Sequence, residues 1–329
     1  MYDVAHAAGV SQTTVSFVVN DAPNTTIPQE TRDRVWAAIE ELGWQPNALA
    51  RGLRMQTSHT IGLISDEIAL SSHAGKIIQG AQDAAWDYTK MLLVINTGNN
   101  DDIERTALKM MLERQVEGLI YATMYQREVV PPPVLAQVPT VLLDCYATDR
   151  SLPSVVPDEV QGGRTATELL LRKGHRRIGF LNEVGSLPAM FGRLEGYKQA
   201  LAAYGVPFDP GLVCAGTVIA PEGYRCALDL LRLPEPPTAL FCYNDSMAMG
   251  AYDAAKQLGL AIPGDVAIVG FDNLEVIAAQ LRPPLTTVEL PHYSMGQWAV
   301  QYLLDHADAS HPEPIQKTIA CPLIERASA

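Results

Sequence analysis

The chain has 329 residues, of which 47% are hydrophobic and 19% charged, as is typical of folded rather than disordered proteins. Its net charge of −13 argues against general attraction to nucleic acid. No apolar run approaches the ~20 residues needed to cross a bilayer, and the N-terminus lacks the pattern of a secretory signal. We therefore expect a cytoplasmic protein, without membrane contact, of about two or three domains. The five cysteines are scattered without a C-x-x-C pair or a His/Cys cluster, which predicts buried reduced thiols, no metal site and no cofactor.

Residues 1–20 have the pattern of two short helices joined by a tight turn. Residues 2–8 are rich in alanine and precede Gly9, which accepts the positive φ of a helix end without penalty. Ser11 can then cap a second helix over residues 12–19 with its hydroxyl. Small apolar side chains are spaced so that the two helices face each other: Val4, Ala5, Ala8, Val10, Val15 and Val18 or Val19.

The second helix is expected to present Gln12, Thr13, Ser16 and Phe17 on its outer face. This geometry is typical of a helix-turn-helix, whose second helix enters the major groove of DNA. The alternative is a plain helical hairpin. Residues 1–57 carry four arginines against six acidic residues, a balance of −2, and this is unusual for a DNA-binding segment because phosphate neutralisation supplies most non-specific affinity.

A third helix is predicted over residues 29–42, with an apolar stripe of Val35, Ala38, Ile39 and Leu42 and with Gly43 at its end. Residues 46–54 also look helical. An isolated helix of about nine residues is shorter than the ~12–15 needed for marginal stability in water. This segment is either a helix that folds when something binds it or a plain interdomain linker, and the composition does not separate the two.

From residue 60 the chain alternates between apolar runs and helical stretches, which predicts parallel sheets covered by helices on both faces. The spacing of Gly62 and Gly80 is nearly repeated by Gly179 and Gly196, which indicates two similar halves with a cleft between them. The predicted strands cover residues 60–64, 91–96, 118–121, 140–143, 177–181, 239–243 and 267–270. The predicted helices lie near residues 75–89, 102–115, 160–173, 193–204, 221–232 and 246–258.

Polar and acidic residues follow these strands, where ligands bind in such sheets. They are Asp66, Asn96, Asp144, Asn182, Glu183, Asn244, Asp245, Asp272 and Asn273. Carboxylates and amides that converge on a cleft suit hydroxyl-rich ligands such as sugars. Capping of the next helix is the alternative, and for Asn244 and Asp245 it is at least as well supported, whereas Asp272 has the position of a ligand residue.

These motifs resemble the LacI (lactose repressor) family of bacterial transcription regulators. Residues 2–20 are similar to its helix-turn-helix, 30–47 to its third helix and the exit from it, and 47–53 to its hinge helix. The segments 238–245 (TALFCYND), 268–272 (IVGFD) and 284–287 (PLTT) match its core signatures. The resemblance covers essentially the whole chain in order.

The resemblance implies a homodimer that binds operator DNA through two headpieces. By that match Gln12, Thr13 and Phe17 read bases, while Ser16 and Asn20 lie near phosphates. Leu53 would wedge into the minor groove. The full expected DNA-binding set is Ser11, Gln12, Thr13, Ser16, Phe17, Asn20, Asn47, Ala50 and Leu53.

The resemblance also implies an effector site in the cleft of a core like the periplasmic sugar-binding proteins. Asp144, Arg193, Asn244 and Asp272 match positions where family members contact effector. His73 matches a pocket position that is often aromatic, and a surface loop position is the alternative for it. The effector is expected to be a small molecule, with a sugar favoured.

The expected fold class is a small all-α helix-turn-helix headpiece plus an α/β periplasmic-binding-protein-like core of two doubly wound parallel-sheet subdomains. The headpiece is expected at 1–44, the hinge helix and linker at 45–57, and the core at 58–329. Within the core, 58–156 plus 286–306 would form the N-subdomain and 157–285 plus 307–329 the C-subdomain. No G-x-S-x-G, H-E-x-x-H, P-loop or G-x-G-x-x-G motif indicates an enzyme.

The expected function is that of a sequence-specific repressor controlled by the cleft ligand. The alternatives are a purine- or phosphoprotein-controlled regulator of the same family, or a small-molecule-binding protein without DNA function. Phe17 stands where the family usually has Arg, so weaker guanine preference is expected there. The chain begins where the family has several more, commonly basic, residues, and we expect an upstream start. No leucine heptad follows residue 326, so a dimer is expected rather than a tetramer.

Overall fold

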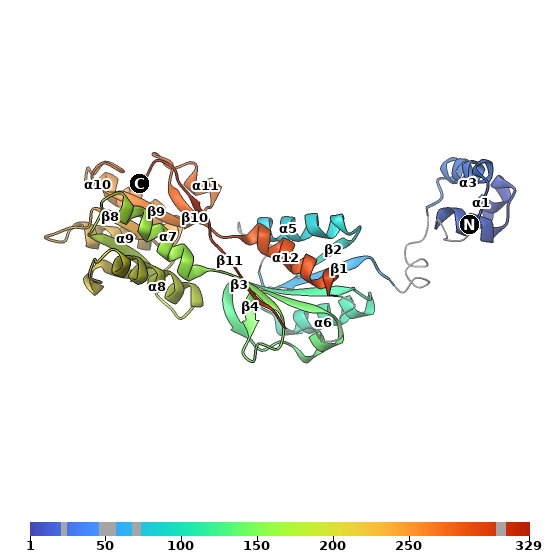
Figure 1. Cartoon of the computed structure of the whole chain (residues 1–329), viewed down its shortest axis with the longest axis horizontal. Helices are drawn as coiled ribbons and strands as arrows, with labels where there is room; N and C mark the ends of the chain where they lie inside the picture. Colours follow the sequence, from blue (N-terminus) through green and yellow to red (C-terminus); the bar gives the residue numbers. More distant parts are fainter. Residues whose placement is uncertain (21–24, 46–56, 68–73, 307–313) are drawn as a thin grey trace. The chain divides into compact units, whose positions relative to one another are not determined.

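The computed structural model describes residues 1–20, 25–45, 57–67, 74–306 and 314–329. It divides into two compact units, Met1–Ser58 and His59–Ala329. Among the described residues, the smaller unit has three helices and the larger has two six-stranded sheets with their covering helices (Figure 1).

The described part of the small unit contains α1 (Tyr2–Ala8), α2 (Gln12–Val19) and α3 (Gln29–Leu42). Gly9 ends α1 in the left-handed conformation with φ of 65°, and the Ser11 hydroxyl accepts a hydrogen bond from Thr14 N at 3.0 Å. Both local predictions are therefore confirmed. The core contains the small apolar residues expected from the spacing, joined by two from α3: Val4, Ala5, Ala8, Val15, Val18, Val35 and Ala38. Leu42 is 47% exposed, so the predicted stripe of α3 ends before it.

The first sheet has the strand order β11-β5-β4-β3-β1-β2, and all its pairings are parallel. Its strands are β1 (Thr60–Ser65), β2 (Met91–Asn96), β3 (Gly118–Val129), β4 (Thr140–Ala147), β5 (Ser154–Pro157) and β11 (Gln316–Ile319). The helices α5 (Ala74–Asp87) and α12 (His292–Asp305) cover one face, and α6 (Asp101–Glu113) covers the other (Figure 1). A short 3-10 helix, η2 (Pro133–Gln137), also packs on the α6 face through Leu135.

The second sheet has the order β12-β10-β9-β8-β6-β7, and only the terminal β12 is antiparallel. Its strands are β6 (Ile178–Glu183), β7 (Val213–Gly216), β8 (Ala239–Cys242), β9 (Ala267–Asp272), β10 (Thr286–Glu289) and β12 (Leu323–Ile324). One face carries α7 (Glu159–Arg172) and α8 (Pro188–Ala203), and the other carries α9 (Ala220–Leu231) and α10 (Asp245–Gln257). The short elements η3 (Pro210–Leu212) and α11 (Glu275–Ala278) complete this part.

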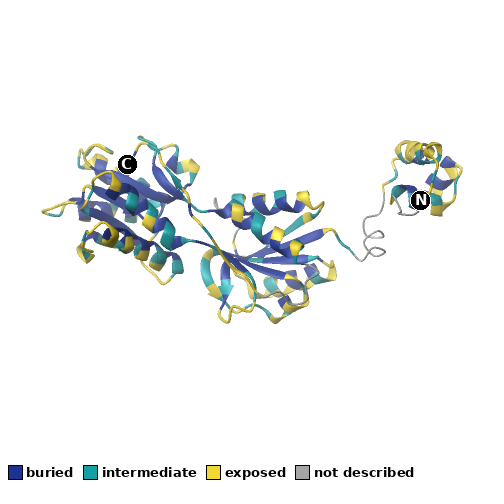
Figure 2. Cartoon of the chain, viewed as in Figure 1, coloured by how far each residue is buried: buried dark blue, intermediate teal, exposed yellow. Residues whose placement is uncertain are grey.

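Strands with long apolar runs form the centre of each sheet. In β8, Ala239 and Phe241 pack under α7 and α8, whereas Leu240 and Cys242 pack under α9 and α10. Because successive side chains of a strand point to opposite faces, a strand covered on both sides must be apolar throughout. Figure 2 shows the resulting dark-blue strands between helices whose outer faces are exposed.

Three pairs of helices approach each other at glycines. A Cβ added to Gly80 of α5 would lie 2.0 Å from the Tyr293 carbonyl oxygen of α12, and one on Gly196 of α8 would lie 2.1 Å from Val160 O of α7. Their counterparts Gly296 and Gly163 face back at similarly short distances, and Gly223 of α9 and Gly250 of α10 form the third pair. The repeated glycine spacing in the sequence therefore corresponds to the same type of helix contact in each half.

The structure corrects the expected division of the core. Residues 286–289 were placed in the N-subdomain, yet β10 pairs with β9 in the second sheet. Residues 316–319 were placed in the C-subdomain, yet β11 pairs with β5 in the first sheet. The chain thus crosses between the sheets after residue 157, after 289 and again after 319, because β10 and β11 add to sheets that earlier segments begin.

The cysteine prediction also needs correction. A disulfide joins Cys214 of β7 to Cys226 of α9, whose Cα atoms are 5.5 Å apart. The strand and the helix that packs on it bring together two thiols that are separated by 12 residues in sequence. Cys145, Cys242 and Cys321 are free and buried, as expected.

Candidate functional site

The exposed face of α2 is the candidate DNA-binding face. Gln12 and Thr13 are exposed and Phe17 is half-buried, as a reading face requires. Ser16 is only 8% exposed, so the prediction that it lies on the outer face is wrong. Its carbonyl oxygen and its hydroxyl accept hydrogen bonds from Asn20 Nδ2 at 2.7 and 3.2 Å, which fixes Asn20 at the end of the helix.

Four of the expected site residues lie outside the described part of the chain. These are Asn47, Ala50 and Leu53 of the expected hinge helix and His73 of the expected effector site. Their predicted roles stay predictions.

The candidate effector site is a cavity of about 400 Å³ at the carboxyl ends of strands from both sheets. Asp144 at β4, Arg193 on α8, Asn244 after β8 and Asp272 at β9 all line it. The structure therefore brings together the four described residues that the sequence proposed. The other lining residues are Met124, Tyr125, Gln126, Pro157, Glu159, Glu183, Leu187, Ala189, Val218, Tyr243, Ser246, Leu274, Leu290 and His292.

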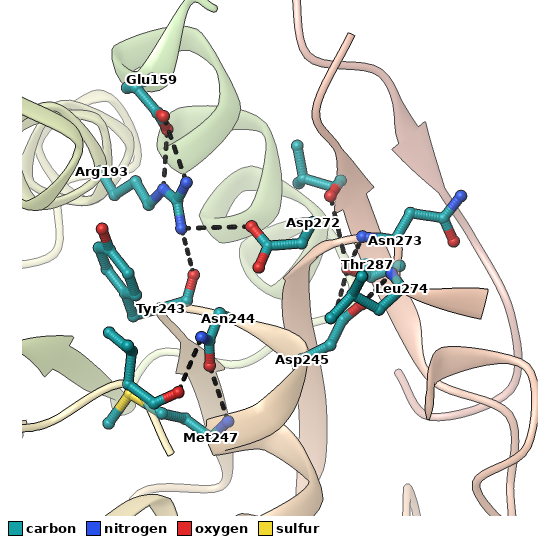
Figure 3. Close-up of polar contacts among 12 residues, drawn as sticks. Glu159, Arg193, Tyr243, Asn244, Asp245, Met247, Asp272, Asn273, Leu274 and Thr287 are labelled. Carbon is teal, nitrogen blue, oxygen red and sulfur yellow. Dashed lines mark hydrogen bonds and ion pairs between the residues drawn. The ribbon is translucent and has the colours of Figure 1, made fainter. Parts of the chain in front are cut away.

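Arg193 holds one wall of this cavity together (Figure 3). Its guanidinium donates to both carboxylate oxygens of Glu159, at 2.7 and 3.2 Å, and to Tyr243 O at 2.5 Å. Asp272 Oδ1 lies 3.7 Å from Nη1. The guanidinium also stacks 3.7 Å from the centre of the Phe271 ring. Burial works against its charged form, yet the carboxylate of Glu159 and other nearby groups raise the pKa of Arg193, so it is a fixed cation that positions α7, β8 and β9.

The two polar residues after β8, Asn244 and Asp245, have different roles. Asn244 caps α10, accepting from Met247 N at 2.8 Å and donating to Val218 O at 3.1 Å, while its side chain still lines the cavity. Asp245 is fully buried and accepts from Thr287 Oγ1 at 2.6 Å and Leu274 N at 2.7 Å (Figure 3). The capping alternative thus holds for Asn244, and Asp245 belongs to the interior.

Asp144 is a buried carboxylate of the cavity. It is 5% exposed, has a left-handed φ of 56°, and its Oδ1 has no hydrogen-bond partner among the described residues. Burial and the nearby carboxylate of Glu159 raise its pKa well above the usual range, and the Arg193 guanidinium only partly opposes them. Such a group takes part readily in ligand binding because a bound donor restores what burial removed.

Several lining residues were not singled out from the sequence. The register of β3 against β4 shifts between Ala122 and Arg127, and this irregularity places Met124, Tyr125 and Gln126 at the cavity. A bulge is not visible in an apolar pattern. Glu183 was among the polar strand-end residues, so the sequence carried a signal for it. Glu159 could not be predicted as a lining residue, because an acidic residue in the first turn of a helix is common.

The helix-turn-helix of the small unit, and a cavity lined by both sheets of the α/β unit, define a DNA-binding regulator with a periplasmic-binding-protein-like core. Residues 1–47 match the family described as bacterial regulatory proteins, lacI family. Residues 58–327 match the periplasmic binding proteins and sugar binding domain of LacI family. The chain belongs to the LacI family of DNA-binding transcription regulators.

Similar proteins agree with this assignment. The chain is 32% identical to the HTH-type transcriptional repressor CytR of Escherichia coli strain K12, over 100% of this chain and 95% of the relative. It is 34% identical to the repressor PurR of Escherichia coli O139:H28, over 99% and 95%. A lac repressor dimer bound to operator and the anti-inducer ONPF matches 99% of this chain and 98% of its own, with a TM-score of 0.81 and 28% identity. A CelR–cellobiose complex matches 99% and 98%, with a TM-score of 0.69 and 28% identity.

Among the described residues no helix is long and apolar enough to cross a membrane. The same residues contain no group of three His, Cys, Asp or Glu side chains placed to hold a metal ion.

Proposed function

We propose that the chain is a cytoplasmic, sequence-specific repressor whose operator affinity is controlled by a small polar molecule, a sugar, in the cavity. The main support for this proposal is that one chain contains both a helix-turn-helix and a cavity lined by the expected effector residues, Asp144, Arg193, Asn244 and Asp272. Carboxylate and amide acceptors at strand ends suit a ligand rich in hydroxyl groups. The cellobiose complex of CelR, a similar structure, supports a carbohydrate.

In this proposal Gln12, Thr13 and Phe17 contact base edges in the major groove, and Ser11, Ser16 and Asn20 contact phosphates or hold the helix that does so. Asn47, Ala50 and Leu53 act in the minor groove as a hinge helix that folds on DNA. Because the cavity is lined from both sheets, a ligand favours one arrangement of the sheets over another. That preference changes the affinity for operator.

We infer that the repressor is a homodimer joined through the edge of the first sheet. β2 is an edge strand whose apolar residues are half-exposed or exposed. Large apolar residues of β2 and of the helices α5 and α6 beside it are exposed: Met91 by 62%, Trp86 by 72%, Ile103 by 47% and Met110 by 44%. Exposed apolar residues concentrated on adjacent elements are typical of a protein interface.

The test is binding of the full chain, with and without an extended N-terminus, to the promoter beside its own coding region. We expect specific binding in fluorescence anisotropy that weakens steeply with salt, because phosphate contacts release counterions. A thermal-shift screen of sugars and nucleobases should then find a compound that raises Tm and changes operator affinity. Absence of specific binding to any promoter fragment would remove the repressor proposal. Stabilisation by nucleobases alone would favour the purine-controlled alternative.

A further inference from the structure

A disulfide closes a loop that carries part of the cavity wall. It joins Cys214 of β7 to Cys226 of α9, 12 residues apart in sequence. Val218 lies inside this loop and lines the cavity. The carbonyl oxygen of Val218 accepts a hydrogen bond from Asn244 Nδ2 at 3.1 Å, and Asn244 in turn caps α10. The disulfide therefore constrains the segment that helps to hold one of the expected effector residues in place.

The strand at one end of this loop is short and lies at the edge of the second sheet. β7 has four residues, pairs with β6 alone, and only its last residue, Gly216, is buried. The helix at the other end is anchored separately, because Gly223 and Gly250 bring α9 into close contact with α10. A short edge strand opens locally at little cost unless something ties it down. The disulfide ties β7 to the anchored helix.

The two sulfur atoms lie in a setting that favours thiol–disulfide exchange. Arg225 donates hydrogen bonds to Cys214 Sγ at 3.7 Å and to Cys226 Sγ at 3.4 Å. Glu222 and Asp229 hold the guanidinium in place and offset part of its charge, but its N–H groups still face both sulfurs. Cys214 is partly exposed on the edge strand. Reactive cysteines have such a partly exposed position beside a cation, because the cation stabilises the thiolate.

The other three cysteines have the opposite setting. Cys145, Cys242 and Cys321 are free and buried, and burial is the main cause that raises the pKa of each thiol. A raised pKa leaves little thiolate, so these thiols are inert to exchange. Redox chemistry at cysteine is therefore confined to the pair beside Arg225.

We propose that Cys214 and Cys226 form a reversible redox pair, and that its reduction loosens the cavity wall at Val218 and Asn244. In the cytoplasm, where the proposed function places the chain, a disulfide is usually transient and redox-sensing. The pair itself does not depend on the proposed function. The consequence, that effector binding then depends on the redox state of the cell, rests on it.

The reaction is an exchange with a low-molecular-weight thiol such as glutathione. Its thiolate attacks the partly exposed Cys214 sulfur, the S–S bond breaks, and Cys226 leaves as a thiolate that Arg225 stabilises. A second thiolate attacks the glutathione sulfur of this mixed disulfide and releases Cys214. Two thiols have then passed two electrons and two protons to the pair and have become one disulfide. Glutathione disulfide reverses each step.

Labelling of the full chain tests whether the pair is reversible. The chain is equilibrated in mixtures of reduced and oxidised glutathione, quenched with acid, and labelled with N-ethylmaleimide in denaturant. Mass spectrometry should show five labels in reducing mixtures and three in oxidising ones, because only the pair changes. The change should reverse with the glutathione ratio. Three labels in every mixture would make the disulfide a fixed structural one, and five would mean that it does not form, so either result overturns the proposal.

Hydrogen exchange of the full chain, without effector or DNA, tests whether the wall loosens. After reduction, amides of residues 213–219 and of the first turn of α10 should exchange at least about tenfold faster, because β7 opens and the Asn244 cap loses its anchor. The amides of β4 in the first sheet should be unchanged and serve as the internal reference. Equal exchange in the oxidised and reduced chains would overturn the proposal.

Variants at cysteine separate the pair from the other thiols. Cys214→Ser cannot form the disulfide, so residues 213–219 should exchange as fast as in the reduced wild type, whatever the glutathione ratio. The control Cys321→Ala removes a buried free thiol and should keep the full difference between the two redox states. Slow exchange in Cys214→Ser would show that the disulfide does not hold the wall.

The role of the guanidinium is tested by the rate of reduction with dithiothreitol. Arg225→Gln removes the donors to both sulfurs, and we expect reduction to slow by about fivefold or more, because the leaving thiolate loses its stabilisation. The control Arg232→Gln removes an exposed arginine just after α9 and should change the rate less than about twofold. Equal rates in the two variants, or faster reduction of Arg225→Gln, would overturn the role given to Arg225.

The labelling and exchange measurements separate this inference from the proposed function, because they need neither effector nor DNA. Absence of a specific operator complex would remove the repressor and leave a redox pair that passes both tests. A chain that binds its operator but shows no redox change would keep the repressor and lose the redox pair.

Discussion

The family resemblance matches Arg193 to a ligand contact, but in the structure this residue mainly positions other residues of the cavity wall. With 3% of its surface exposed, it uses its donors on Glu159 and on Tyr243 O before any ligand arrives. A planar guanidinium suits this task because it can satisfy a carboxylate bidentately and stack on Phe271 at once. Asp272 Oδ1 lies 3.7 Å from its Nη1, so the same guanidinium also positions a second carboxylate of the cavity.

The replacement Arg193→Met should therefore be costly to stability. It leaves Glu159, which is 6% exposed, without its counter-charge, and we expect the free energy of unfolding to fall by about 3–5 kcal/mol. Urea denaturation measures the loss. Adding Glu159→Gln to the same chain should recover part of it, because the unpaired charge disappears. A loss below about 1 kcal/mol in the single variant would show that the pair is not structurally important.

Phe17 carries the prediction on base preference. It is half-buried on α2, beside the exposed Gln12 and Thr13, and a phenyl ring contacts a thymine methyl but cannot read guanine bidentately. Sites selected from random DNA by the wild type should lack a dominant guanine at the facing position, and Phe17→Arg should introduce one. Phe17→Leu is the matched control and should leave the selected guanine fraction low. A dominant guanine selected by the wild type would contradict the assignment of Phe17 to that base.

At the scale of elements, the central strands and their helices were predictable because burial on both faces imposes an apolar run. β2 was predicted with both its bounds, and α5, α6, α7, α9 and α10 within one or two residues. The missed strands β5, β7, β10 and β11 are as short as β8, but polar residues, proline or glycine interrupt their apolar character, whereas β8 is apolar throughout. The missed β12 has only two residues. After β10 in the second sheet the chain passes to α12, which covers the first sheet. Which sheet a strand joins is decided by long-range pairing, and a local sequence pattern does not contain that information.

The same reasoning explains the outcome at the candidate site. Asp144, Asn244 and Asp272 were predictable because each follows a strand that the apolar pattern marks. Arg193 came only from the family resemblance, since nothing in the sequence pairs it with Glu159. The buried position of Ser16 was missed because helical spacing alone does not show whether a small polar residue at the edge of the apolar face is buried or exposed.

Helix contacts at glycine give a prediction at this scale. Gly80→Ala would place a Cβ 2.0 Å from Tyr293 O, a backbone atom that cannot swing away, so α5 and α12 must separate. We expect a loss of about 2 kcal/mol or more in unfolding free energy, measured by denaturant titration. Gly75→Ala in the same helix meets nothing within 4 Å and should be neutral or slightly stabilising. Equal effects of the two alanines would rule out close helix contact as the reason for Gly80.

At the scale of the whole molecule, charge and assembly are connected. The chain carries a net −13, and residues 1–57 carry a balance of −2 from four arginines and six acidic residues, so one headpiece has little electrostatic affinity for DNA. Two headpieces on one dimer bind adjacent half-sites with a high effective concentration for the second contact. The proposed dimerisation would therefore raise the operator affinity of a chain whose single headpiece is acidic.

The paired change Ile103→Glu and Met110→Glu tests the proposed dimer face. Both residues lie on α6, with 47% and 44% of their surfaces exposed, so the chain should fold normally. Four added charges across a two-fold interface should yield monomers in sedimentation velocity at micromolar concentration, and operator affinity should fall about 100-fold or more. The control Tyr204→Glu, at an exposed aromatic residue after α8, should remain dimeric and bind operator normally. A variant at α6 that stays dimeric would place the interface elsewhere. Monomers that bind operator with undiminished affinity would instead show that one headpiece suffices, contrary to the argument from charge.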